Sequence, residues 1–369
     1  MKTVRRLLYA DITSSVLFVA MAFLSLFFFL DFVDELGDVG KGYTALHAAL
    51  YSLLELPGHL YELSPIAVLI GSIYALSRLA QSSEFTILRT GGLGPARALS
   101  LLMGLGLFFG VVTFVVGDYI APLSERAAAE IHAGNKGGLS LGGRAGVWLK
   151  DRRMTPDGEH NYSINITSAG SRGELLRVRV LEFDAKQRQV RRLFAQRGHV
   201  SGNTWVLSEV DVTEWGDAFA SDSPQVKTHH LPEYSWQSTL SASVVAAAVL
   251  PENSMSTLEL FRYIAHLSDN EQAAQRYEIK FWKRALYPLA CLVMVGLALP
   301  FAYLHARAGG VSLKVFGGIM LGISFVLLNT VAAHVGLLRN WTPWMVAAGP
   351  SLFYLLLSLA AFSWLVRYR

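Results

Sequence analysis

The chain of 369 residues has very little cysteine and long stretches without charge. Its one cysteine, Cys291, stands in an apolar run, so we expect no disulfide and no CxxC metal site. No G-x-x-x-x-G-K-[ST] motif occurs, which excludes ATP hydrolysis by the P-loop mechanism. The formal net charge of +4 comes without a basic patch with interleaved aromatic residues. Nucleic acid is therefore not an expected partner.

Charge is missing above all from runs long enough to cross a membrane. Hydrophobic residues make up 52% of the chain and charged residues 16%, and a spanning helix needs roughly 20 mostly apolar residues. Such runs cover 12–30, 98–117, 285–304, 315–338 and 340–366, and a shorter one covers 63–77. We therefore predict six membrane-spanning helices in two sets of three. A buried core helix is the alternative for 63–77, and a cleavable signal peptide is the alternative for 12–30.

Basic residues of the tails and short loops gather on one side of these spans. The N-terminal tail, the loop 78–97, the turn with Arg307 and Lys314, and the C-terminal end all carry Lys or Arg. The opposite short loops hold only Lys41 and Arg339 among acidic residues. By the positive-inside rule, both termini are expected in the cytoplasm and the central segment outside, in the periplasm of a bacterium.

The central segment, from about 139 to 249, has a β pattern. Short runs rich in β-forming residues alternate with turn residues, which predicts strands at 147–149, 162–167, 175–183, 189–195, 205–213 and 225–230. The spacing favours an antiparallel sandwich, a jelly roll or a half-open barrel. We expect three parts: spans one to three in 1–120, the β domain in 121–255, and a helix with spans four to six in 256–369. The pair Ser256 and Glu259 predicts a capping box at the start of that helix, which we expect to run to about residue 267.

The loop between the second and third spans carries a second helix signal. Ser82 or Ser83 is expected to cap a short helix over about 82–90, with Glu84 in its first turn and Gly91-Gly92 at its end. ABC-type permeases present a coupling element to a separate ATPase in this way, although many cytoplasmic turns have the same pattern.

The spans themselves hold few ionisable residues, with His334 the nearest case, whereas ion-coupled transporters keep such residues at depth. Energy for a transport reaction would come from another subunit. Arg276, Lys280, Lys283 and Arg284 form a basic cluster at the outer start of the fourth span, which predicts attraction for anionic head groups or, equally, helix-end snorkelling. The spacings Gly106-Gly110 and Gly318-Gly322 permit close helix packing.

Several motifs together resemble the lipopolysaccharide export permeases of the LptF/LptG family. They are Ser-Glu-Phe-Thr-Ile-Leu-Arg-Thr-Gly-Gly at 83–92, Ala121-Pro122, and the run from Arg276-Tyr277 through Lys283 to Pro288-Leu289, in a chain of three plus three spans. The segments 32–36, 79–81 and 146–151 are most like the LptG branch. The resemblance covers essentially the whole chain.

This resemblance implies the permease subunit of an ABC-type transporter in the inner membrane of a Gram-negative bacterium. It would extract lipopolysaccharide and pass it to a periplasmic bridge of β-jellyrolls, to which the central β domain would contribute. The implied partners are an LptF-like permease, a dimer of the ATPase LptB, which binds the ATP and Mg²⁺, and the transmembrane helix of LptC. This chain would be no enzyme and hold no cofactor or metal. The alternative is a non-transporting membrane scaffold or sensor whose β domain binds a partner.

The resemblance also implies roles for individual residues. The ATPase-coupling candidates are Ser83, Glu84, Phe85, Leu88 and Arg89. Relatives often carry Lys at the end of the first span, where this chain has Asp31, and a carboxylate repels phosphate unless a divalent cation bridges the two. The lipid-phosphate candidates are therefore Lys41, Arg126, His132, Lys280 and Lys283. The apolar-cavity candidates are Phe23, Phe27, Phe28, Phe316, Ile319 and Phe325, with lipid-facing or helix-packing roles as the alternative for each.

Overall fold

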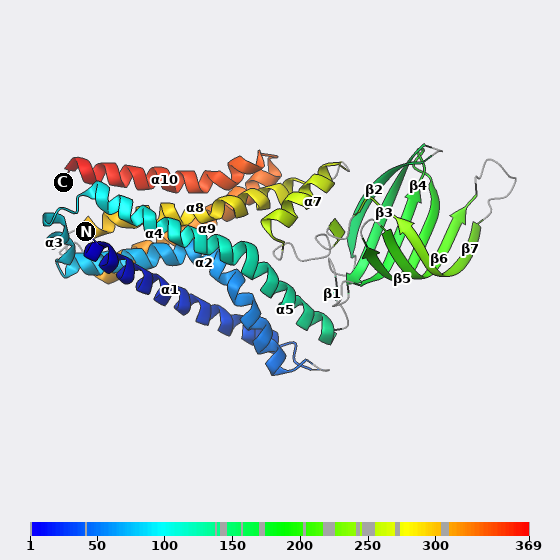
Figure 1. The fold of residues 1–369 in the computed structure, drawn as a ribbon, viewed down its shortest axis with the longest axis horizontal. Coiled ribbons are helices and arrows are strands. Elements are labelled where there is room, and N and C mark those ends of the chain that lie inside the picture. Colours follow the sequence, from blue (N-terminus) through cyan, green and yellow to red (C-terminus); the bar gives the residue numbers. More distant parts are fainter. Residues whose placement is uncertain are drawn as a thin grey trace. The chain divides into compact units, whose positions relative to one another are not determined.

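A computed structural model describes residues 2–40, 43–136, 139–140, 146–155, 158–169, 174–201, 204–216, 226–240, 244–245, 255–269, 274–303 and 310–368. The chain forms two compact units. One comprises Met1–Asp34, Glu55–Ser124 and Gln275–Arg369, and the other comprises Glu35–Leu54 and Glu125–Ala274. The first is helical and the second contains the β domain (Figure 1).

Six long helices are apolar enough to cross a membrane. They are α1 (Lys2–Leu36), α2 (Ala45–Gln81), α4 (Pro95–Val115) with its continuation, α8 (Gln275–Tyr303), α9 (Val311–Leu338) and α10 (Pro343–Tyr368). The continuation of α4 is a π-helical segment, η1 (Val116–Ile120), followed by α5 (Ala121–Lys136). All six predicted spans are confirmed, including 63–77 within α2, and the protein is an integral membrane protein.

The helical unit packs around α2, α4 and α8. In the apolar stretch of α2, 72% of the residues are buried, against 11% in that of α1, so most of α1 faces outward. Glycines allow close approach where they were expected. A Cβ on Gly110 would lie 2.9 Å from the carbonyl oxygen of Pro288, and one on Gly322 would lie 2.9 Å from the Ile66 side chain. A larger residue at either position would require the Pro288 backbone or the Ile66 side chain to shift.

The β domain is one antiparallel sheet in which each of β2 to β7 pairs with the next. The strands are β1 (Leu139–Ser140), β2 (Val147–Thr155), β3 (Gly158–Ala169), β4 (Leu175–Phe183), β5 (Gln189–Ser201), β6 (Thr204–Trp215) and β7 (Val226–Gln237). The six predicted strands are confirmed, most of them longer than expected, and the two-residue β1 was missed. The predicted fold class, a six-span helical membrane protein with an inserted antiparallel β domain, is confirmed.

The sheet curls, and its two edge strands come together through Asp151. This carboxylate on β2 is 1% exposed and accepts hydrogen bonds from the hydroxyl of Ser238 at 2.8 Å and from the amide and hydroxyl of Thr239, just after β7. The guanidinium of Arg153 on β2 lies 5.0 Å from the ring of Trp236 on β7. Alternate residues of β5, such as Leu193 and Ala195, are buried and fill the interior of the curl, whereas β7 buries only Trp236.

A helix, α7 (Thr257–Asp269), follows the sheet, and its predicted capping box is confirmed. The backbone N–H of Ser256 donates to Oε2 of Glu259 at 2.8 Å, and the backbone N–H of Glu259 donates to Oγ of Ser256 at 3.3 Å.

Candidate functional site

The helix predicted in the loop between the second and third spans is present as α3 (Glu84–Thr90). Figure 1 shows it at the same end of the helical unit as both chain termini. Gly92, at φ +98°, ends the helix, with Leu93 N–H donating to the Leu88 carbonyl at 3.0 Å and Gly92 N–H to the Arg89 carbonyl at 3.0 Å. This is a Schellman ending, which needs a left-handed residue that glycine supplies without strain.

The predicted serine cap of α3 is wrong. Ser83 stands at the N-cap position, but at φ 61° it is left-handed and makes no side-chain cap hydrogen bond. A capping residue normally has extended backbone angles, which aim its oxygen at the free amides of the first turn. The hydroxyl of Ser82 instead donates back to the Leu79 carbonyl of α2 at 3.3 Å.

One face of α3 is anchored in the helical core. Phe85 is 2% exposed, and its ring packs edge-on against Tyr303 at the end of α8, with centroids 5.1 Å apart. The guanidinium of Arg89 lies 4.8 Å from the same Tyr303 ring, and half-buried Leu88 packs against the core. The end of α8 is therefore in direct contact with α3.

The other face of α3 is open. Ser83, Glu84 and Thr86 are exposed, and the side chain of Ile87 is 67% exposed. The five coupling candidates thus divide into an outward pair, Ser83 and Glu84, and three residues that hold the helix in place. Sequence reasoning missed Tyr303, because nothing in the residues around it indicates a contact with Phe85. It also missed Ile87, which could have been found as an apolar residue in a polar loop.

The lipid-phosphate candidates are not one cluster in the described residues. Lys41 lies outside the described residues, and so does the side chain of His132 on α5. Arg126, in the unit with the β domain, pairs with Glu259 at 2.5 Å and so ties α5 to α7. Lys280 and Lys283 belong to the helical unit, where both are half-buried. Lys283 donates through Nζ to the Asn329 carbonyl at 2.9 Å.

Arg284, the last member of the predicted basic cluster, is a buried link between three spans. It is 8% exposed, donates to the Gly117 carbonyl and lies 3.9 Å from Asp118 in the π-helical segment η1. Its guanidinium also lies 5.7 Å from the ring of Tyr61 on α2. A π-helical segment frees carbonyls from their usual partners, which gives the arginine its acceptor.

Asp31, where the resemblance led us to expect a lysine, has a partner inside the chain. Its Oδ2 lies 2.8 Å from Nε2 of His59 on α2, and the Phe27 ring packs 4.7 Å from the His59 ring. The carboxylate is thus hydrogen-bonded within the protein. Sequence reasoning missed His59 because 28 residues separate the pair.

The apolar-cavity candidates differ in exposure. Phe316 on α9 is 56% exposed, whereas Phe23, Phe27, Phe28 and Ile319 are half-buried. Phe325 is 1% exposed and packs edge-on against Tyr354 of α10 at 5.3 Å. For Phe325 the structure favours the helix-packing alternative over a cavity lining.

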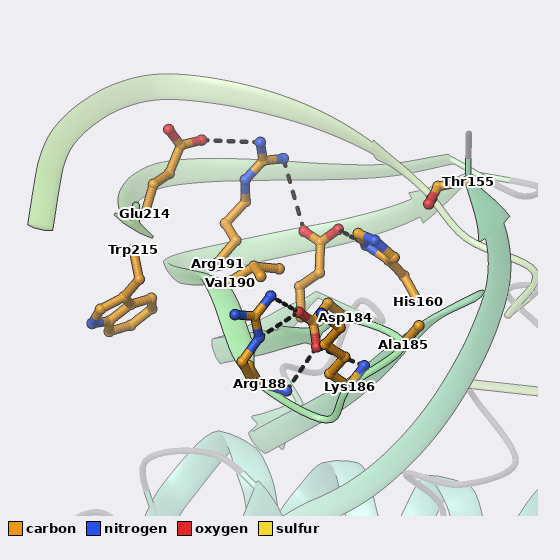
Figure 2. Close-up of a pocket in the computed structure, with 11 residues that line it drawn as sticks. Thr155, His160, Asp184, Ala185, Lys186, Arg188, Val190, Arg191, Glu214 and Trp215 are labelled. Carbon is orange, nitrogen blue, oxygen red and sulfur yellow. Dashed lines mark hydrogen bonds and ion pairs between the residues drawn. The ribbon is translucent and has the colours of Figure 1, made fainter. Parts of the chain in front are cut away.

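The β domain has a charged cavity of about 660 Å³ where β4 turns into β5 (Figure 2). Glu182 accepts hydrogen bonds from His160 and Tyr162, each at 2.9 Å, and Arg191 bridges Glu182 at 3.9 Å and Glu214 at 3.0 Å. Burial, followed by the charge and hydrogen bond of Glu182, raises the pKa of Tyr162 to about 12. Because its charges alternate in sign across neighbouring strands, the cavity is no simple anion site.

Within the described residues, no three His, Cys, Asp or Glu side chains converge into a metal-ion site. The fold defines a class: a polytopic membrane protein with an inserted antiparallel β domain. The chain belongs to the family "Lipopolysaccharide export system permease LptF/LptG", whose model matches residues 6–365.

Named relatives align over almost their entire length. The chain is 26% identical over 352 residues to the "Lipopolysaccharide export system permease protein LptG" of Escherichia coli (strain K12), covering 94% of each chain. It is 25% identical over 359 residues to the protein of the same name from Haemophilus influenzae, covering 96% of each. The predicted resemblance is confirmed.

Proposed function

We propose that this chain is the LptG-like permease half of an ATP-driven transporter that extracts lipopolysaccharide from the inner membrane and passes it to a periplasmic β-jellyroll bridge. The family match over residues 6–365 carries the proposal, and both named relatives are lipopolysaccharide export permeases. The six spans and the inserted β domain supply the parts that such a subunit needs.

The proposed orientation places both termini and α3 in the cytoplasm and the β domain in the periplasm. The distribution of Lys and Arg in the short loops supports it. So does the position of α3, which lies at the same end of the helical unit as the two termini.

The proposed partners are an LptF-like permease, two copies of the ATPase LptB and the transmembrane helix of LptC. ATP and Mg²⁺ belong to the ATPase. The open face of α3, with Glu84 and Ile87, would dock on the ATPase, while the Phe85 and Arg89 contacts with Tyr303 carry its movement to α8. A closing ATPase dimer would then favour the state in which the substrate cavity is narrow.

The substrate contacts belong to the same proposal. Exposed Phe316 and half-buried Phe23, Phe27, Phe28 and Ile319 are candidates for acyl-chain contact. Lys41, His132, Lys280 and Lys283 stay candidates for lipid phosphate. Arg126 is a weaker one, because its guanidinium already holds Glu259.

Co-purification tests the coupling role. Glu84→Lys reverses a charge on the exposed face of α3 without touching its anchor, so an ATPase subunit that copurifies with the parent chain should be lost. Glu233→Lys makes the same reversal at an exposed position on β7 and should keep the ATPase. A parent chain that never brings down an ATPase would favour the non-transporting scaffold or sensor instead.

A further inference from the structure

A cavity of about 300 Å³ lies where the first turns of α1 and α4 meet the end of α3. All three elements belong to the helical unit. Val4 and Arg5 come from α1, and Leu88 from α3. Leu93 lies just before α4, and Arg97 and Leu101 lie in its first two turns. Its wall is therefore apolar apart from two arginines and a few smaller groups.

Both arginines are exposed side chains with donors to spare. Arg97 spends one N–H on the Gly92 carbonyl at 3.3 Å, and a guanidinium carries five N–H donors. Among the described residues no carboxylate pairs with Arg5 or Arg97. The amino ends of α1 and α4 also converge here, and the positive ends of two helix dipoles add to the attraction for an anion.

The cavity lies where two membrane spans begin. The uncharged runs of these two helices begin at residues 12 and 98, so Arg5 and Arg97 precede them, where lipid head groups are expected. One turn deeper, the Tyr9 hydroxyl donates to the Leu101 carbonyl at 2.9 Å and joins the two helices. This hydrogen bond fixes the spacing of α1 and α4 on the side of the cavity that faces the membrane interior.

We propose that this cavity binds the head group of an anionic phospholipid, with its phosphate between Arg5 and Arg97 and its upper acyl chain along Val4, Leu93 and Leu101. Basic pockets between spans on the cytoplasmic side recognise such lipids. The choice of the cytoplasmic leaflet rests on the orientation in the proposed function. The site itself rests only on the cavity and its charges.

A lipid bound here would also support α3. Leu88 and Gly91, from the last turn and the end of α3, line the same cavity. One ligand therefore touches α1, α4 and the end of α3 at once. The lipid would favour the anchored position of α3, and the composition of the cytoplasmic leaflet would tune coupling to the ATPase.

The test uses the full transporter complex extracted from nanodiscs of phosphatidylethanolamine, with or without phosphatidylglycerol, and native mass spectrometry of the retained lipid. Arg5→Gln/Arg97→Gln should weaken phosphatidylglycerol retention by about 30-fold, because two basic side chains are lost. Arg6→Gln/Arg367→Gln removes the same charge from exposed positions that do not line the cavity, and should retain the lipid. Arg5→Lys/Arg97→Lys should restore most retention, which separates lost binding from lost folding.

Three outcomes would overturn the proposal. The two glutamine pairs could lose lipid equally, which would show a general charge effect. Free inorganic phosphate could displace phosphatidylglycerol fully, which would make the site one for a soluble anion. Retention could occur in the isolated permeases but vanish when the ATPase is bound, which would assign the cavity to an acidic residue of that partner.

The lipid inference and the proposed function can fail separately. A complex that releases lipopolysaccharide but retains no phosphatidylglycerol at this site overturns only the lipid inference. A chain that retains the lipid through Arg5 and Arg97 but never recruits an ATPase overturns only the transport proposal.

Discussion

Phe85→Ala should detach α3 from the helical core while leaving the six spans intact. The helix has seven residues, too few to be stable alone in water, so its order depends on its anchor. Phe85 is 2% exposed, and truncation of a buried Phe to Ala costs about 3 kcal/mol or more. The contact between Arg89 and Tyr303 remains, but a cation–π contact of this kind contributes only about 1 kcal/mol.

Hydrogen exchange of the permease without ATPase measures this loss. The informative amides are those of Ile87, Gly91, Gly92 and Leu93, which bond within α3 and its Schellman ending. If the opening free energy falls by about 3 kcal/mol, these amides should exchange roughly 100-fold faster. Peptides from α4 and α8 should keep their protection.

Ile87→Ala is the matched control, because Ile87 lies on the same helix but is 67% exposed. It removes no anchor and should leave exchange of α3 within a few fold of the parent. Unchanged protection of α3 in Phe85→Ala would refute the reasoning that the Phe85 contact holds the helix.

Three further perturbations test other parts of the structure. Burial acts to raise the pKa of Glu259, but the Ser256 amide and Arg126 lower it below the ordinary value of 4.5. The capping box should therefore stabilise α7 above that pH and weaken as pH falls through the lowered pKa. Hydrogen exchange of the α7 amides should show this pH dependence in the parent and not in Glu259→Gln. Asp151→Ala leaves the Ser238 hydroxyl and the Thr239 amide and hydroxyl without their acceptor. It should lower the free energy of unfolding of the β domain by about 3 kcal/mol, measured by thermal unfolding. An unchanged midpoint would mean that Asp151 does not join the two edges of the sheet. Gly117→Ala places a Cβ against the Tyr61 ring and should cost about 1–3 kcal/mol, whereas Gly317→Ala meets no atom within 4 Å and should be neutral or stabilising. Equal thermal midpoints for the two variants would contradict the close packing at η1.

The architecture was readable from the sequence because it follows from one-dimensional patterns. Uncharged length predicts spans, β-type runs predict strands, and the S-x-x-E spacing of Ser256 and Glu259 predicts a capping box. Strand ends were placed too early, as at 147–149, because exposed charged residues such as Lys150 continue β2 through its backbone pairing with β3.

The site was readable only in part, because its contacts join residues far apart in the chain. The sequence placed α3 and its glycine ending, but the left-handed angle of Ser83 depends on how α2 turns into α3. Nothing local to Phe85 indicates Tyr303 as its partner, and nothing near Asp31 indicates His59. Arg284 belonged by sequence to a surface cluster, whereas the π-helical segment of α4 gives it a buried acceptor.

ATP-driven release of lipopolysaccharide tests the central claim most directly. Proteoliposomes would contain lipopolysaccharide and the complex of this chain with its permease and ATPase partners, and the periplasmic bridge protein would serve as acceptor. We predict ATP-dependent transfer by the parent complex and about a tenfold or larger loss with Glu84→Ala, which removes a contact on the open face of α3. Transfer that proceeds equally without this chain, or undiminished with Glu84→Ala, would contradict the account.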